Sequence, residues 1–222
     1  MKSSAATALA LVITLSAGPI HAQTVRLEPD LTGPLKQSEW MLDGSGTWLA
    51  VDGKLVLAIA GVPGGAIRRP AAVAILEGSR LRTASVEVEL RSTARVDVPQ
   101  RDLEIIVGYQ SPTRFYYVHL AGITDAVHNG IFVVADADRR RVDDGKGLPQ
   151  LRDQQWHNVR VEWDAASGRI QVYVNGSSAP VLEAVDTTIP EGRVGFGSFD
   201  DTGEFRAIRV TGTAISRTPR QL

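Results

Sequence analysis

Short alternating segments joined by turn residues fill residues 156–210, and they restrict this chain to an all-β fold. The segments WHNVRVEWD and RIQVYVNG each alternate apolar and polar residues. In a strand this alternation places successive side chains on opposite faces, so one face is apolar and the other polar. Asn175-Gly176 is the sequence of a two-residue hairpin turn, whose two central positions require positive φ. The stretch therefore predicts antiparallel strands with one buried face.

The same pattern extends upstream. Further strands are predicted over residues 55–59, 71–76, 86–90, 103–109, 115–120 and 131–134. Residues 103–109 are almost entirely apolar, which indicates a central strand covered on both faces. Residues 23–222 contain no convincing helical period and no repeat of fixed length. About a dozen short strands joined by turns predict a β-sandwich or a barrel.

The chain begins with the pattern of a secretory signal peptide. Lys2 precedes an apolar run over residues 5–17, and Ala22 offers a small residue at a cleavage site. The run is shorter than the roughly 20 apolar residues that span a bilayer. We therefore expect export to the periplasm or the medium, without a membrane span after cleavage. A buried N-terminal helix is the alternative.

The expected layout follows from these patterns. It comprises a signal peptide over residues 1–22, an irregular N-terminal arm over 23–45, one β-sandwich domain over 46–213 and a C-terminal tail over 214–222. The chain has no cysteine, so an exported domain would depend on its core alone for stability.

The charge balance argues against a nucleic-acid partner, because the formal net charge is only −1. Residues 139–141 form the one dense basic run, and flanking aspartates indicate a solvated loop or edge strand. We expect a monomer.

A family resemblance rests on the run WHNVRVEWDAASGRIQVYVNG and on GRVGFGSFDDTGEFRAIRV after it. These segments resemble the concanavalin A-like lectin/glucanase superfamily, and within it the laminin-G-like and 3-keto-disaccharide-hydrolase-like exported bacterial domains. FYYVHLAG and DAVHNGIFVV resemble the middle strands of the same group. The resemblance covers residues 48–212 and implies a jelly-roll β-sandwich of two antiparallel sheets with a saccharide or glycan ligand. It does not fix an activity, because one fold hosts many functions.

Polar and aromatic residues are densest between residues 109 and 129. Tyr117 and His119 share one face of an expected strand, and a loop with further polar residues follows. Aromatic rings stack on sugar rings, and His, Asn and Asp side chains hydrogen-bond sugar hydroxyls. We therefore predict a sugar-binding site formed by Tyr109, Tyr117, His119, Asp125, His128, Asn129 and Arg140. The alternative is that Tyr117 and His119 are half-buried surface residues and that His128 caps a turn.

Catalysis stays open at this stage. Glu87 and Glu89 share a strand face about 7 Å apart, within the roughly 6.5–9.5 Å that inverting glycosidases use, although a solvated face would look the same. The third carboxylate of the glucanase pattern Glu-x-Asp-x-x-Glu is missing from VEVELRS. A lyase could use Tyr117, His119 and Arg140. The functions left are an exported carbohydrate-binding module, a saccharide hydrolase or lyase, and a structural or protein-binding laminin-G-like module.

Asp200 and Asp201 are the candidate metal ligands. The resemblance implies calcium at the rim of the sandwich, as in many laminin-G-like domains, and calcium binds several oxygen ligands at once. The neighbouring glycine also makes this pair an ordinary turn sequence, which is the alternative.

Overall fold

The computed structural model describes residues 23–214, so the expected signal peptide and all but the first residue of the expected tail lie outside the described part. Every regular element in that part is a strand. The strands are β1 (Gln23–Leu27), β2 (Trp40–Gly44), β3 (Thr47–Val51), β4 (Lys54–Ile59), β5 (Ala72–Ser92), β6 (Asp102–Ser111), β7 (Arg114–Ala121), β8 (Gly130–Ala135), β9 (Arg140–Arg141), β10 (His157–Asp164), β11 (Arg169–Val174), β12 (Leu182–Val185), β13 (Gly192–Ser198) and β14 (Gly203–Ala214). No helix among residues 23–214 is long and apolar enough to cross a membrane.

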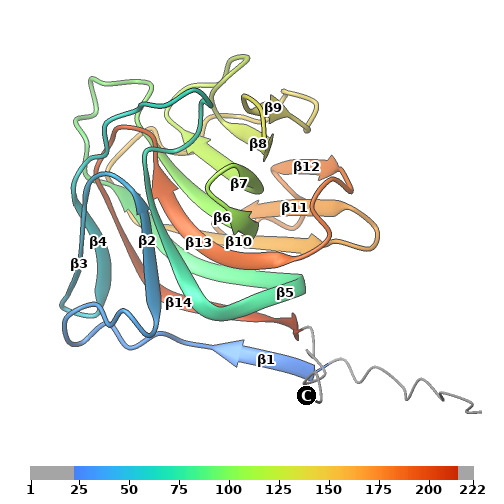
Figure 1. The fold of residues 1–222 in the computed structure, drawn as a ribbon. Coiled ribbons are helices and arrows are strands. Elements are labelled where there is room, and N and C mark those ends of the chain that lie inside the picture. Colours follow the sequence, from blue (N-terminus) through green and yellow to red (C-terminus); the bar gives the residue numbers. More distant parts are fainter. Residues whose placement is uncertain (1–22, 215–222) are drawn as a thin grey trace, which may run out of the picture.

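The strands lie in two layers that share β5 (Figure 1). The first layer has the order β2-β5-β13-β6-β7-β8-β9. The second has the order β14-β5-β10-β11-β12, with β1 and β4 paired to β14 and β3 paired to β4. Neighbouring strands are antiparallel throughout these ladders. The predicted all-β sandwich is confirmed.

β5 joins the two layers. Its residues 72–76 pair with β2 and β13, and its residues 83–92 pair with β10 and β14. Gly78 lies between these halves with φ of 76°, a left-handed conformation that glycine adopts without strain. The sequence pattern predicted two separate strands here, over residues 71–76 and 86–90.

The main core lies between the layers. On β5, Val86, Val88 and Leu90 are buried, whereas Glu87 and Glu89 are only half-buried on the outer face. The predicted division into an apolar and a polar face is therefore confirmed. The rings of Phe196 from β13 and Phe205 from β14 meet across the core with centroids 5.1 Å apart.

A second apolar cluster covers the outer face of the first layer. Its buried members are Val73, Ile75, Ile106, Tyr109, Phe115, Tyr117, Phe132, Val134 and Phe199. Met41 from β2 and Ile67 from the loop before β5 pack against it. The first layer is thus covered on both faces, which confirms the prediction made from the apolar run at 103–109.

Residues 23–45 were expected to form an irregular arm, and the structure corrects this. β1 pairs with β14 from Gln23 to Leu27, and β2 pairs with β5. Trp40 is buried, and its ring centroid lies 6.3 Å from that of Phe196. The turn residues Thr32-Gly33-Pro34 lie between the two strands, so they mark a connection rather than an unstructured segment.

Candidate functional site

A carboxylate–histidine cluster lies on the outer face of the first layer. Asp102 and Glu104 alternate on β6, and Glu104 is the register partner of His119 on β7. The exposed fractions of these three residues are 3%, 0% and 1%. His119 Nε2 lies 3.1 Å from Asp102 Oδ2 and 3.5 Å from Glu104 Oε1. Direct cross-strand neighbours have adjacent side chains, so the pairing of β6 with β7 brings Glu104 next to His119.

The surroundings of His119 fix its orientation. Nδ1 lies 3.1 Å from the carbonyl oxygen of Val127, which can only accept a hydrogen bond, so Nδ1 carries a proton. Nε2 then faces two carboxyl groups. The other oxygen of Asp102 accepts hydrogen bonds from the Ser198 hydroxyl at 2.7 Å and from the Phe199 amide at 3.1 Å. The contact at Nε2 therefore needs either a proton, on the imidazole or on one of the facing carboxyl groups, or a bound cation.

Glu104 is the unusual member of the cluster. Neither of its carboxyl oxygens has a hydrogen-bond partner among the described residues. Burial, followed by the charge of Asp102, raises the pKa of Glu104 well above its ordinary value. For Asp102 burial acts in the same direction, but the hydrogen bond and charge of His119 outweigh it and lower the pKa. A buried polar group without a hydrogen-bond partner costs about 1–3 kcal/mol. The Glu104 carboxyl group therefore lacks a partner that would offset this cost.

Two further carboxyl groups connect the cluster to the surface. Asp201 Oδ2 accepts a hydrogen bond from the Asp102 amide at 3.0 Å, and Asp200 is exposed. Burial, then the charge of Asp102, raises the pKa of Asp201 to about 6, and the same causes raise the pKa of Asp200. One ligand atom each from Asp102, Asp200 and Asp201 lie within 4.8 Å of one another, as do those of Asp102, Glu104 and His119. Among residues 23–214 these two groups could hold a metal ion, and calcium at Asp200 and Asp201 stays a prediction.

The loop between β7 and β8 returns over His119, as the sugar-site hypothesis required. The His119 and His128 ring centroids are 5.6 Å apart, and His128 Nδ1 lies 2.8 Å from Asp125 Oδ2. The Asp125 carboxylate also accepts hydrogen bonds from the amides of Val127 and His128. Asp125, rather than His128, therefore caps this turn.

Other residues of the predicted sugar site are buried supports. The Tyr117 ring stacks on Phe132 with centroids 5.3 Å apart, and it is fully buried rather than half-buried. The Tyr109 hydroxyl donates to Asp43 at 3.0 Å. The buried Asn129 amide donates to the carbonyls of Gly147 and Leu148 and so holds the neighbouring loop. Other protein groups already contact these three side chains. That any of them binds a ligand stays a prediction.

The lyase hypothesis required Arg140 near Tyr117 and His119, but a different arginine contacts Tyr117 in the structure. Arg140 pairs with Asp186 at 2.9 Å. Arg139 instead donates to the Tyr117 hydroxyl at 3.1 Å, and its guanidinium carbon lies 4.5 Å from the centroid of the Phe199 ring. Neighbouring residues of an extended segment point to opposite sides, which separates the two arginines.

Sequence reasoning missed the buried pair Asp102 and Glu104. It also missed Arg139 and Arg68, whose guanidinium carbon lies 5.5 Å from the centroid of the Phe199 ring. The only local signal for the pair was the Asp-x-Glu alternation at the start of an otherwise apolar strand.

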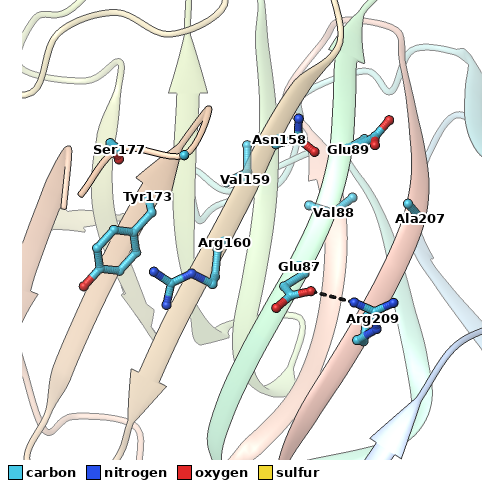
Figure 2. A pocket seen from close by; sticks show the side chains of 11 residues that line it. Glu87, Val88, Glu89, Asn158, Val159, Arg160, Tyr173, Ser177, Ala207 and Arg209 are labelled. Carbon is cyan, nitrogen blue, oxygen red and sulfur yellow. Dashed lines mark hydrogen bonds and ion pairs between the residues drawn. The ribbon is translucent and has the colours of Figure 1, made fainter. Parts of the chain in front are cut away.

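The outer face of the second layer carries a groove of about 340 Å³ (Figure 2). Its floor includes Glu87, Arg160, Tyr173 and Arg209, one from each of four adjacent strands. Glu87 bonds Arg209 at 2.9 Å, and the Arg160 guanidinium carbon lies 4.0 Å from the centroid of the Tyr173 ring.

Glu87 and Glu89, the candidate carboxylates for inverting hydrolysis, are both ion-paired in this structure. Glu89 contacts Arg206 at 2.6 Å, and Glu87 contacts Arg209. Both carboxylates are partly exposed side chains on the outer face of β5, so the structure favours the alternative of a solvated face.

No protein-family model and no curated protein matches the chain. Solved structures do match. The carbohydrate-binding module CBM66 from Bacillus subtilis aligns with a TM-score of 0.60 at 12% identity, over 78% of this chain and 95% of that one. A basic winged bean lectin with Tn-antigen aligns with a TM-score of 0.56 at 14% identity, over 88% and 100%. The GH43 protein BlXynB from Bacillus licheniformis, a K247S mutant, aligns at 0.53 and 10% identity, over 84% of this chain and 39% of that one. At these identities the matches establish the fold alone.

Proposed function

This chain has the concanavalin A-like jelly-roll fold that its sequence resembles, and we propose that it is a carbohydrate-binding protein. Two kinds of neighbour support the proposal, because CBM66 is a carbohydrate-binding module and the winged bean protein is a lectin with Tn-antigen. The observation that carries it is a polar rim around Phe199 on the outer face of the first layer. We define this rim by Arg68, Asp125, His128, Arg139 and Asp200.

The rim offers the groups that recognise sugar hydroxyls. Carboxylates accept hydrogen bonds, guanidinium groups donate them, and imidazole can do either. The Asp125 and His128 side chains are 44% and 19% exposed, so both can reach a ligand. Their mutual hydrogen bond and that of Arg139 to Tyr117 hold the groups in place. Such preorganisation lowers the entropy cost of binding a flexible ligand.

The groove of Figure 2 is a second surface for the same function. Its volume and Tyr173 favour a saccharide there. Three of its charged groups are already ion-paired, Glu87 with Arg209 and Arg160 with Glu162, so a ligand would compete with existing ion pairs. In the rim, by contrast, Asp200 is exposed and forms no salt bridge among residues 23–214, so its carboxylate is available to a ligand. We therefore place the ligand at the rim.

We propose binding rather than catalysis. A general acid or base must come within hydrogen-bond reach of the substrate. Glu104 and His119 are 0% and 1% exposed, so neither side chain can reach a saccharide at the surface.

Export is part of the proposal, on the strength of the signal-peptide pattern at residues 1–22. N-terminal sequencing of protein recovered from outside the cytoplasm of an expressing bacterium tests it. A product that begins near Gln23 supports export, and an intact cytoplasmic chain contradicts it.

A glycan array probed with labelled protein tests the function itself, and calorimetry with the strongest saccharide then compares variants. His128→Ala and Asp200→Asn should each weaken binding by about tenfold, equivalent to about 1.4 kcal/mol. The matched controls Tyr173→Ala and Asn158→Ala alter the groove and should leave affinity unchanged. The opposite pattern would move the site to the groove. If folded wild-type protein binds nothing on the array, the proposed function is wrong.

A further inference from the structure

We infer that Asp102, Glu104 and His119 form a site for a divalent first-row transition metal of the Zn²⁺ or Mn²⁺ type, with Asp201 at its outer side. The inference concerns a second ligand and does not depend on saccharide binding.

The distances between the donor atoms fit such an ion. A metal with ligands at about 2.0–2.2 Å places neighbouring donors roughly 3.0–3.5 Å apart. His119 Nε2 lies 3.1 Å from Asp102 Oδ2 and 3.5 Å from Glu104 Oε1. A neutral imidazole would otherwise direct its lone pair at two carboxyl oxygens.

The surrounding hydrogen bonds already orient these donors. A histidine that binds metal through one nitrogen commonly donates its other N–H to a carbonyl or carboxylate. His119 has that partner in the Val127 carbonyl. Ser198 and Phe199 occupy Asp102 Oδ1, and this leaves Oδ2 turned toward the histidine.

Glu104 supplies the independent indication of a missing ligand. Buried polar groups are almost always hydrogen-bonded, yet neither oxygen of this fully buried side chain has a partner among residues 23–214. Protonation of Glu104 repairs only part of this, because a hydroxyl at Oε1 could donate to a neutral His119 Nε2 while Oε2 would still have no partner. A cation between Glu104 and His119 satisfies both groups together.

Charge and access agree with the same assignment. Four carboxyl groups, those of Asp102, Glu104, Asp200 and Asp201, lie within this small region. Asp200 is exposed beside the cluster, so an ion can enter from the surface.

The donor set selects the class of metal. Imidazole nitrogen together with carboxylate suits first-row transition ions, whereas Ca²⁺ is held by six to eight oxygen ligands. The all-oxygen group of Asp102, Asp200 and Asp201 is the place where Ca²⁺ would bind instead.

The test is calorimetric titration of chelator-stripped protein with ZnCl₂, MnCl₂ and CaCl₂, without any sugar. Wild type should bind about one equivalent of Zn²⁺ or Mn²⁺, and this should raise its thermal midpoint. Glu104→Gln and His119→Gln should each weaken binding by more than about tenfold. Glu89→Gln, which changes an ion-paired carboxylate of the second layer, is the matched control and should bind as wild type does.

Circular dichroism of each stripped variant separates loss of metal from loss of fold. Should His119→Gln fail to fold, Asp201→Asn replaces it, because this partly exposed residue lies at the edge of the cluster. The inference is overturned if folded wild type binds neither Zn²⁺ nor Mn²⁺, or if Glu104→Gln binds them unchanged. It is equally overturned if only Ca²⁺ binds and Asp200→Asn alone abolishes it.

Discussion

Glu104 and His119 face each other across β6 and β7, with 3.5 Å between Glu104 Oε1 and His119 Nε2, and neither oxygen of Glu104 is hydrogen-bonded within the described residues. A carboxyl group in this position destabilises the metal-free fold. Destabilising groups inside a well-packed layer commonly mark functional sites, where stability is traded against activity.

Replacement of Glu104 with an apolar side chain of similar size should therefore stabilise the metal-free protein. We expect Glu104→Met to raise the free energy of unfolding by about 1–3 kcal/mol, the cost of an orphaned buried polar group. Urea titration in the presence of a chelator measures this. A variant less stable than wild type would show that the carboxyl makes a favourable interaction in the apo protein.

Asp186 should make stability depend on acidity. Burial alone would raise its pKa, but hydrogen bonds from Thr188, Tyr116 and Arg140 outweigh burial and hold the pKa below its ordinary value. The stabilisation is complete above the unfolded-state pKa near 3.9 and is lost as the pH falls below it toward the lowered folded value. Urea titrations at successive pH values from about 6 to 3 should show a shallower decline for Asp186→Asn than for wild type. If the free energy of unfolding falls equally with pH in both proteins, Asp186 is not the source of this pH dependence.

Gly108 should not tolerate a side chain. Its φ is 69°, and an added Cβ would lie 2.8 Å from Ile189 Cγ2 and 3.2 Å from the Trp163 ring. Gly108→Ala should lower the free energy of unfolding by about 2–4 kcal/mol, from backbone strain and overpacking together. Gly53→Ala is the matched control, because φ is 72° there with no atom within 4 Å, and it should show only the backbone part. Equal losses in the two variants would refute the packing argument.

Most of the fold could be predicted from local sequence patterns. Asn175-Gly176 predicted a hairpin turn, and both residues have positive φ, at 51° and 73°, in the connection between the antiparallel strands β11 and β12. The alternation at residues 86–90 predicted which side chains are buried. These signals act between near neighbours in the chain, so they can be read without tertiary information.

Contacts between distant residues could not be predicted in the same way. The pairing of Glu104 with His119 depends on the register of β6 against β7, which no local pattern specifies. The same limit hid the contact of Arg139, rather than Arg140, with Tyr117. The single strand β5 was predicted as two strands, over residues 71–76 and 86–90, because its two halves pair with different partners. His119 and His128 were predicted to belong to one site and do lie close together, but the buried carboxylates beside His119 were not predicted.

The central claim is that a saccharide binds at the rim around Phe199, and an amide NMR titration tests it most directly. Isotope-labelled protein is titrated with the saccharide that binds best on the glycan array, and the residues whose signals shift are mapped. The account predicts that the largest shifts fall in residues 125–129 and 199–201, which carry Asp125, His128 and Asp200. Shifts confined to the groove residues 158–160 and 173–177, or no shifts at saturating saccharide, would contradict it.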